Sequence, residues 1–260
     1  MDYFNKLELI EDIFNEKINF EKHLSSVSMD ALIKDINKNH EYLPLQGSFY
    51  VTNDALEEKN WKELDKKIKD ELNSVFIKFK NLSNINETIL EQLLEYKKKY
   101  PNIPSIYNYI INTYTILKDV PKKYETILET VNKFPDYIFG KVALAEHYRI
   151  NNMHKNIPQV FDNKLDIFLF APRKNSTYHL SEIKAFYLII GEYYLLEHKI
   201  SHALMCYLFL KEFEEEKSKE HIFNFGKEIV IHELNELTNQ FKKNVKIPQK
   251  KKTVKNKKMK

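Results

Sequence analysis

The feature that most restricts the fold of this chain is a stretch that occurs twice, 34 residues apart. Residues 100–114 read YPNIPSIYNYIINTY, and residues 134–148 read FPDYIFGKVALAEHY. Each begins with an aromatic residue and a proline, and the apolar positions that follow align as well. A constant period of this size is typical of stacked helical hairpins rather than of a single globular core.

The second of these stretches shows why a pair of helices is expected. Pro135 cannot continue a helix, so one helix should end at Phe134 and Pro135 can lie in the first turn of the next. The apolar residues that follow recur with a period near 3.6, and Ala145 is small where two helices would cross. The asparagines at 151–152 favour a turn, and a second helix is expected over 157–161.

A third unit at residues 185–216 has small and aromatic residues at similar intervals, and this set resembles the tetratricopeptide repeat (TPR) over about residues 70–217. The matching residues are Tyr187, Ile190, Gly191, Tyr194, Ala203 and Tyr207 here, and Leu144, Ala145, Tyr148, Ile157, Phe161 and Pro135 one unit earlier. Ile111 and Lys123 depart from the repeat pattern, and the insert 171–182 displaces the last unit. The resemblance implies an all-α, TPR-like superhelix of antiparallel helix pairs; an irregular helical bundle is the alternative.

Three regions are expected along the chain. Residues 1–53 would form an N-terminal helical segment and a connector, 54–241 the TPR-like repeat domain with a capping helix, and 242–260 a disordered lysine-rich tail. Two apolar stripes predict short N-terminal helices: Leu7, Ile10, Ile13, Phe14, and Met29, Leu32, Ile33, Ile36. The connector, 39–53, is predicted to be extended but not to form a sheet.

Long helices are expected on both sides of the repeats. One should begin at Asp54, with Asn53 or Asp54 as its cap, and should end before the break at 81–86. Its stripe is Trp61, Leu64, Ile68, Leu72, Val75, Phe76 and Phe79. A final helix should cover the open end of the solenoid. Its inward residues would be Ile222, Phe225, Ile229, Leu234, Leu237 and Phe241.

Composition restricts the class of protein further. Cys206 is the only cysteine, which excludes an intrachain disulfide and a cysteine-rich zinc site. The start of the chain is not a secretory signal, and no apolar run approaches the roughly 20 residues that span a bilayer, so we expect a cytoplasmic protein. The net charge of +4 includes ten lysines within 242–260, which leaves a mildly acidic body.

The candidate binding surface follows from the resemblance, because the first helix of each TPR unit lines the concave side. The groove would include Asn108, Asn112, Thr115, Phe139, Val142, Glu146, Arg149, Leu188, Glu192 and Leu195. Arg149 is one of only two arginines and could hold a carboxylate with two hydrogen bonds, or it could simply pair with Glu146 or Glu192.

The insert 171–182 is a second candidate, because long loops often carry binding residues. Arg173, Tyr178 and His179 would be its binding residues, and Ser181 is expected to cap the next helix. Alternatively, the insert is tolerated and simply packs on the body.

No metal or cofactor site is predicted. His198, His202 and Cys206 have i, i+4, i+8 spacing, but the expected helix turn near His198 leaves only two of them on one helix. No phosphate loop, nucleophile elbow or H-E-x-x-H motif is present, so no enzymatic activity is predicted.

These observations favour a non-enzymatic scaffold that holds a peptide or helix of another protein in a concave groove. The alternative is a nucleic-acid- or ribosome-associated adaptor in which the lysine-rich tail supplies affinity for phosphates. A third and less favoured hypothesis is an enzyme whose site lies in the N-terminal region.

Overall fold

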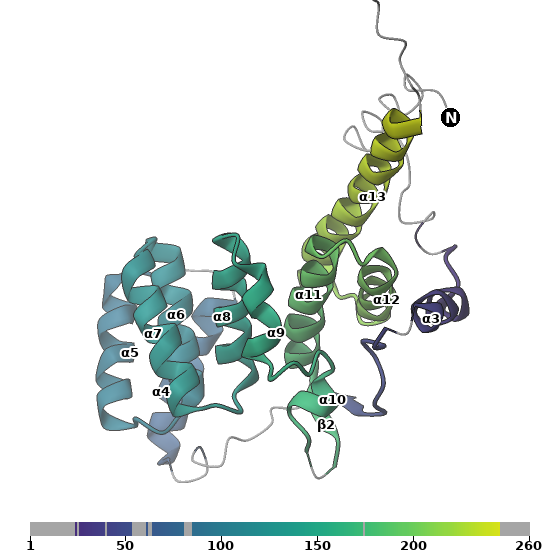
Figure 1. The fold of residues 1–260 in the computed structure, drawn as a ribbon. Coiled ribbons are helices and arrows are strands. Elements are labelled where there is room, and N and C mark those ends of the chain that lie inside the picture. Colours follow the sequence, from purple (N-terminus) through teal and green to yellow (C-terminus); the bar gives the residue numbers. More distant parts are fainter. Residues whose placement is uncertain are drawn as a thin grey trace, which may run out of the picture.

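The computed structural model describes residues 24, 26–39, 41–53, 61, 64–80, 85–173 and 175–244, and helices make up most of it (Figure 1). The first predicted apolar stripe and residues 245–260 of the predicted tail lie outside the described residues. Residues 242–244, also predicted to be disordered, are instead part of the last helix. The elements in chain order are α3 (Met29–Lys38), β1 (Tyr50–Thr52), α4 (Lys66–Lys80), α5 (Glu87–Lys99), α6 (Pro104–Leu117), α7 (Val120–Lys133), α8 (Ile138–Ile150), η2 (His154–Asn156), α9 (Ile157–Val160), α10 (Ile167–Phe170), β2 (Thr177–His179), α11 (Leu180–Leu196), α12 (Ile200–Lys211) and α13 (Glu216–Asn244). The mainly helical class predicted from the sequence is confirmed.

The 34-residue spacing is visible in the backbone. Tyr100 and Phe134 end α5 and α7 in the same way: their φ/ψ values are −127°/63° and −128°/71°, and each N–H donates to the carbonyl four residues back. Pro101 and Pro135 follow, and neither can donate a backbone hydrogen bond. Pro135 lies in the turn before α8 and not in its first helical turn, where it was expected.

The turns after α6, α8 and α11 also share a geometry. Each contains one residue in the left-handed region: Lys118 (φ 59°), Asn152 (φ 58°) and His198 (φ 59°). The first two are 34 residues apart, and the last two are 46 apart, which is that period plus the 12 residues of the insert 171–182. The turn predicted at the two asparagines is confirmed, and each such turn reverses the chain between helices.

The second helix of the middle unit is shorter than predicted. α9 ends at Val160, where Asp162 and Asn163 both adopt left-handed backbone (φ 52° and 59°) and stop the helix. A new short helix, α10, then begins. Asp166 is its N-cap, and the Asp166 side chain accepts the Phe168 N–H at 2.8 Å. Helix α8 packs directly against α11.

The prediction of a long helix that begins at Asp54 was partly wrong. Helix α4 begins at Lys66, and residues 54–60 lie outside the described part. Trp61 stacks on Phe76 with 5.7 Å between the ring centroids. One continuous helix would hold these residues about 22 Å apart, so the chain has to bend between them.

The prediction that the connector forms no sheet was also wrong. β1 pairs in parallel with β2 of the insert, in the register Tyr50–Thr177, Val51–Tyr178 and Thr52–His179. The buried Asp166 carboxylate holds the preceding turn, because it accepts the backbone N–H groups of Gln46 (2.5 Å) and Gly47 (3.3 Å). No local feature of the sequence indicates this pairing, since β1 and β2 are far apart in the chain.

Buried apolar side chains form two clusters. One joins α4, α5 and α6, and the other joins α3, α8 and α11 to α13. The predicted inward residues of the last helix are buried at Ile222, Phe225, Ile229 and Leu234, and Cys206 on α12 is fully buried as well. Among the helices that the structure describes, none is both long and apolar enough to cross a bilayer.

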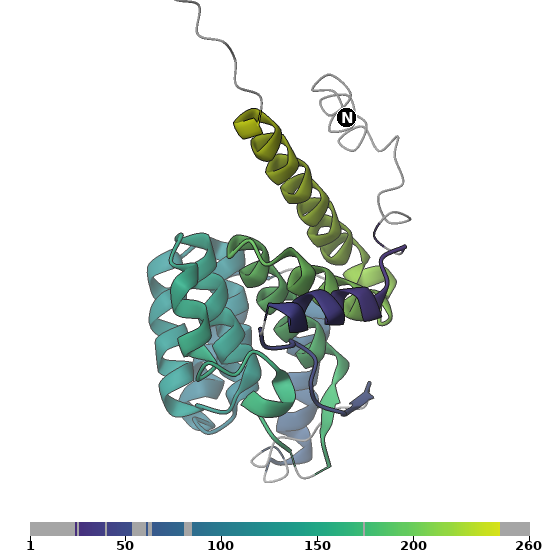
Figure 2. The ribbon, with the colours of Figure 1, turned by 45° about the vertical axis from the view of Figure 1, so that its right-hand side comes forward.

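Helix α11 crosses α12 and α13 at Gly191, the predicted small residue. A Cβ atom added there would lie 2.5 Å from Cζ of Phe225 on α13 and 3.1 Å from Cβ of Cys206 on α12. Ala145, the equivalent small residue on α8, is fully buried. Both views show α13 extending beyond the other helices (Figure 1, Figure 2).

We predict that Gly191→Ala lowers the free energy of unfolding by about 1–3 kcal/mol, because the buried Phe225 ring has to move. Urea unfolding followed by circular dichroism would measure this. The double variant Gly191→Ala, Phe225→Leu should recover part of the loss, since the smaller side chain makes room. If the loss in the double variant instead equals the sum of the losses in the two single variants, residues 191 and 225 do not contact each other.

Candidate functional site

Three of the predicted groove residues occupy equivalent positions on α6, α8 and α11. Asn112, Glu146 and Glu192 are separated by 34 and 46 residues, the same intervals as the turns, and we call them the polar row. One helical turn later, Ile116, Ile150 and Leu196 occupy the next equivalent positions, and we call them the apolar row. Residues four apart share a helix face, so the two rows lie side by side.

The apolar row is exposed. Relative exposures are 42% for Ile116, 58% for Ile150 and 42% for Leu196. The sequence analysis did not single out this row, although its spacing follows directly from the repeat. Leu195, by contrast, was predicted to line the groove but is buried at 6% exposure.

The other predicted groove residues differ in exposure. Asn112 and Thr115 are exposed, and the remaining positions are half-buried: Asn108, Phe139, Val142, Glu146, Arg149, Leu188 and Glu192. Val142 and Leu188 pack against the larger core cluster. The hydroxyl of Thr115 donates to the Ile111 carbonyl on its own helix.

Arg149 and Glu192 form an ion pair between α8 and α11, one of the two pairings considered from the sequence. Nε of Arg149 lies 2.8 Å from Oε2 of Glu192, although the angle is not that of a hydrogen bond. The two side chains are 32% and 19% exposed. Arg149 thus has its ionic partner within the chain itself.

The Glu192 carboxyl group is nevertheless poorly stabilised as an anion. Burial raises its pKa from 4.5 to about 7, and Arg149 offsets only part of this. Glu228 of α13 and Glu146 of α8 raise the pKa further, because their negative charges are close. Sequence reasoning missed Glu228, since its position depends on how α13 packs on α11.

A second group of side chains lies where α13 passes the turn between α11 and α12. His198 Nδ1 lies 3.2 Å from Glu236 Oε1, and His232 Nδ1 lies 3.8 Å from the same oxygen. The rings of His198 and His232 are 4.7 Å apart between centroids. His198 was considered as a ligand together with His202 and Cys206, but the structure brings it to different partners.

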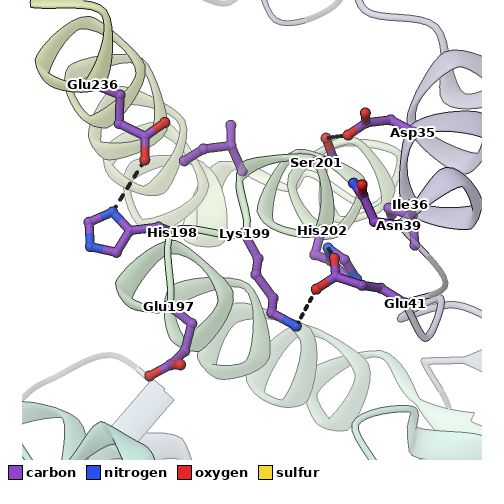
Figure 3. A pocket seen from close by; sticks show the side chains of 11 residues that line it. Asp35, Ile36, Asn39, Glu41, Glu197, His198, Lys199, Ser201, His202 and Glu236 are labelled. Atoms are coloured by element: carbon purple, nitrogen blue, oxygen red, sulfur yellow. Dashed lines mark hydrogen bonds and ion pairs between the residues drawn. The ribbon is translucent and has the colours of Figure 1, made fainter. Parts of the chain in front are cut away.

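A polar pocket of about 450 Å³ adjoins this group, between α3, the α11–α12 turn and α13 (Figure 3). Its walls are tied together by Ser201, whose hydroxyl donates to Asp35 at 2.6 Å, and by Lys199, which pairs with Glu41 at 2.7 Å. His202 lies 3.0 Å from the Tyr42 carbonyl, and burial lowers its pKa. These ties fix α3 and the connector on α12.

The residues predicted in the insert make contacts within the chain. Arg173 holds the Glu182 carboxylate with two hydrogen bonds of 2.8 and 2.7 Å. Tyr178 is fully buried, and its hydroxyl donates to the Ala171 carbonyl at 2.7 Å. His179, not Ser181, caps α11: its Nδ1 accepts the Ser181 N–H, while Glu182 accepts the His179 N–H.

No family model, no curated protein and no solved structure matches the chain. Its function is therefore inferred from contacts, burial and charge.

We predict that Glu192 makes stability fall as the pH rises. Its pKa in the folded state, about 7, lies above the ordinary value of 4.5, so the folded state holds this proton more tightly than the unfolded state. The contribution of Glu192 to the free energy of unfolding is fully present below pH 4.5. It falls by about 2–3 kcal/mol as the pH rises through 7. Urea unfolding of Glu192→Gln and wild type from pH 5 to 8 would measure the difference.

Glu192→Gln should become more stable relative to wild type as the pH increases. Glu95→Gln, which replaces an exposed carboxylate on α5, is the control and should follow the wild-type profile. Parallel profiles for wild type and Glu192→Gln would contradict the prediction.

Proposed function

We propose that this chain is a non-enzymatic protein-interaction scaffold. In this proposal the helix pairs form a TPR-like superhelix, and the polar and apolar rows line a groove for a peptide or helix of another protein. The partner segment is amphipathic: it places apolar side chains on the apolar row and a lysine or arginine among the carboxylates. The following observations support this.

The repeating geometry supports the superhelix. Equivalent helix ends at Tyr100 and Phe134, and equivalent turns at Lys118, Asn152 and His198, recur at the spacing of the sequence repeat. Pairs that repeat in this way present the same helix face again and again on one side. A binding surface made of equivalent positions, such as the two rows, follows from that arrangement.

The charge around Glu192 is the observation that carries the choice of partner. The carboxylates of Glu146 and Glu228 lie close enough to Glu192 to raise its pKa, while Arg149 pairs with Glu192 and Lys123 lies 4.0 Å from Glu146. Burial is the main cause of the raised pKa of Glu192, the two neighbouring carboxylates add to it, and Arg149 offsets only part of the rise. A cation from a partner would stabilise the ionised form of Glu192, so the groove favours a basic group at this point.

The exposed apolar row supports the rest of the surface. Ile150 lies one turn from Glu146, and Leu196 lies one turn from Glu192. A helix bound across α8 and α11 would therefore meet apolar side chains and carboxylates together. This combination is how amphipathic helices are held in grooves.

The proposal can be tested with a displayed library of random peptides selected on the purified chain. We predict enrichment of peptides that combine spaced apolar residues with lysine or arginine. Ile150→Asp should weaken the selected peptides about tenfold or more, because it removes apolar burial of about 1.5–3 kcal/mol. Ile77→Asp is the matched control: Ile77 is 57% exposed against 58% for Ile150 but lies on α4.

The affinity should also rise between pH 6 and 8, because a bound cation lowers the pKa of Glu192 and releases its proton. Glu192→Gln should remove this rise. Enriched peptides that are acidic, or that bind the Ile77→Asp and Ile150→Asp variants equally, would refute the proposed groove.

The second candidate is an adaptor that binds nucleic acid, which the composition of the tail favours. Residues 242–260 contain ten lysines and no acidic residue. Such a segment can neutralise phosphates in a sequence-independent, salt-dependent manner.

Deletion of residues 242–260 distinguishes the two functions. We expect the truncated chain to keep the selected peptides and to lose whatever retention the full chain shows on a polyanion column. Retention of the full chain should fall steeply as salt is added. If the truncated chain instead lost the peptides, the tail and not the groove would be the binding element.

A further inference from the structure

We propose that His198, His232 and Glu236 form a binding site for a first-row divalent transition metal ion, with Zn²⁺ as the representative ion. The nitrogen and oxygen atoms that these residues offer all lie within 4.8 Å of one another. The site is separate from the peptide groove and does not depend on the function proposed for it.

The three residues come from two elements that pack together. His232 and Glu236 are four residues apart on α13, so they point from the same face in successive turns. His198 comes from the turn between α11 and α12, and Figure 3 shows it facing Glu236. A shared ion would thus join α13 to the α11–α12 pair.

The distances are close to those of a metal site. Donors at about 2.0–2.1 Å from a tetrahedral ion are about 3.3 Å from each other. The glutamate oxygen already lies 3.2 Å from His198 Nδ1 and 3.8 Å from His232 Nδ1. The His198 side chain is 69% exposed, so it can rotate to close the remaining gap between the two imidazoles.

The His232 side chain has a nitrogen suited to a metal. Its Nδ1 is a buried atom without a hydrogen-bond partner. An imidazole nitrogen that no hydrogen bond occupies can ligate a metal ion.

The donor types decide the class of ion. Two imidazoles and one carboxylate suit Zn²⁺ and its neighbours in the first transition row, whereas Mg²⁺ and Ca²⁺ prefer oxygen atoms alone. Three protein ligands leave a fourth position open to water. His198 and Glu236 line the pocket of about 450 Å³, which gives that position access to solvent.

The test uses the full chain, freed of metal by chelation and then dialysed. We expect calorimetry to give one Zn²⁺ per chain with a Kd of about 10 μM or tighter. Co²⁺ should bind at the same site and give the intense visible absorption of a low-coordinate nitrogen and oxygen environment. Mg²⁺ in excess should not displace either ion.

Three variants identify the ligands. His198→Gly, which suits the left-handed backbone at this residue, and Glu236→Gln and His232→Ala should each weaken Zn²⁺ binding about 100-fold. His221→Ala is the control, because His221 is an exposed histidine on the same helix, and it should bind as wild type does. Circular dichroism in chelator would show whether each variant folds.

Metal binding should also stabilise the fold. At about a hundredfold excess of Zn²⁺ over the Kd, the unfolding midpoint of the wild type should rise by about 5 °C or more, and that of His198→Gly should not. Absence of stoichiometric binding, or equal binding by His198→Gly, Glu236→Gln and wild type, would overturn the proposal.

Discussion

The close packing of α13 on α11 at Gly191 is the contact on which both candidate sites depend. The Phe225 ring fills the space where any larger residue on α11 would place its Cβ atom. This contact sets how far α13 is shifted along α11. Glu228, His232 and Glu236 follow Phe225 on α13, so the same contact places a carboxylate near Glu192 and a histidine near His198. A small residue in the core thereby determines two polar arrangements at the surface.

The side chains around Glu192 and those around Glu236 favour different kinds of ligand. Around Glu192, negative charge exceeds positive charge, and the fold tolerates this because the carboxyl group can keep its proton near neutral pH. Around Glu236, one carboxylate faces two imidazoles, whose ring nitrogens can donate electron pairs. The first arrangement favours a basic organic group, and the second favours an ion that accepts electron pairs.

The sequence was most informative where the determinants are local or periodic. The helix ends at Tyr100 and Phe134, the turn at Asn152 and the small residue Gly191 could all be located, because each depends on a few neighbouring residues or on the repeat. The pair Asp162 and Asn163 is a local signal for the early end of α9, because both residue types tolerate left-handed backbone. The predicted helix nevertheless continued to Phe161.

What could not be predicted depends on contacts between distant segments. The pairing of β1 with β2 and the position of Glu228 follow from how whole helices pack, and no short stretch of sequence encodes them. The spacing of His232 and Glu236 is visible in the sequence. Their meeting with His198 is not, because it requires the register of α13 against α11.

The parallel pairing of β1 with β2 has a consequence for the order of folding. The connector is held by Asp166, 120 residues further along the chain, and by a strand that comes later still. During synthesis, the connector therefore has no partner until the ribosome has made most of the helices. Contacts between nearby residues form first and distant ones follow. The connector can thus attach only after the segments that hold it have been made, although it precedes them in the chain by more than a hundred residues.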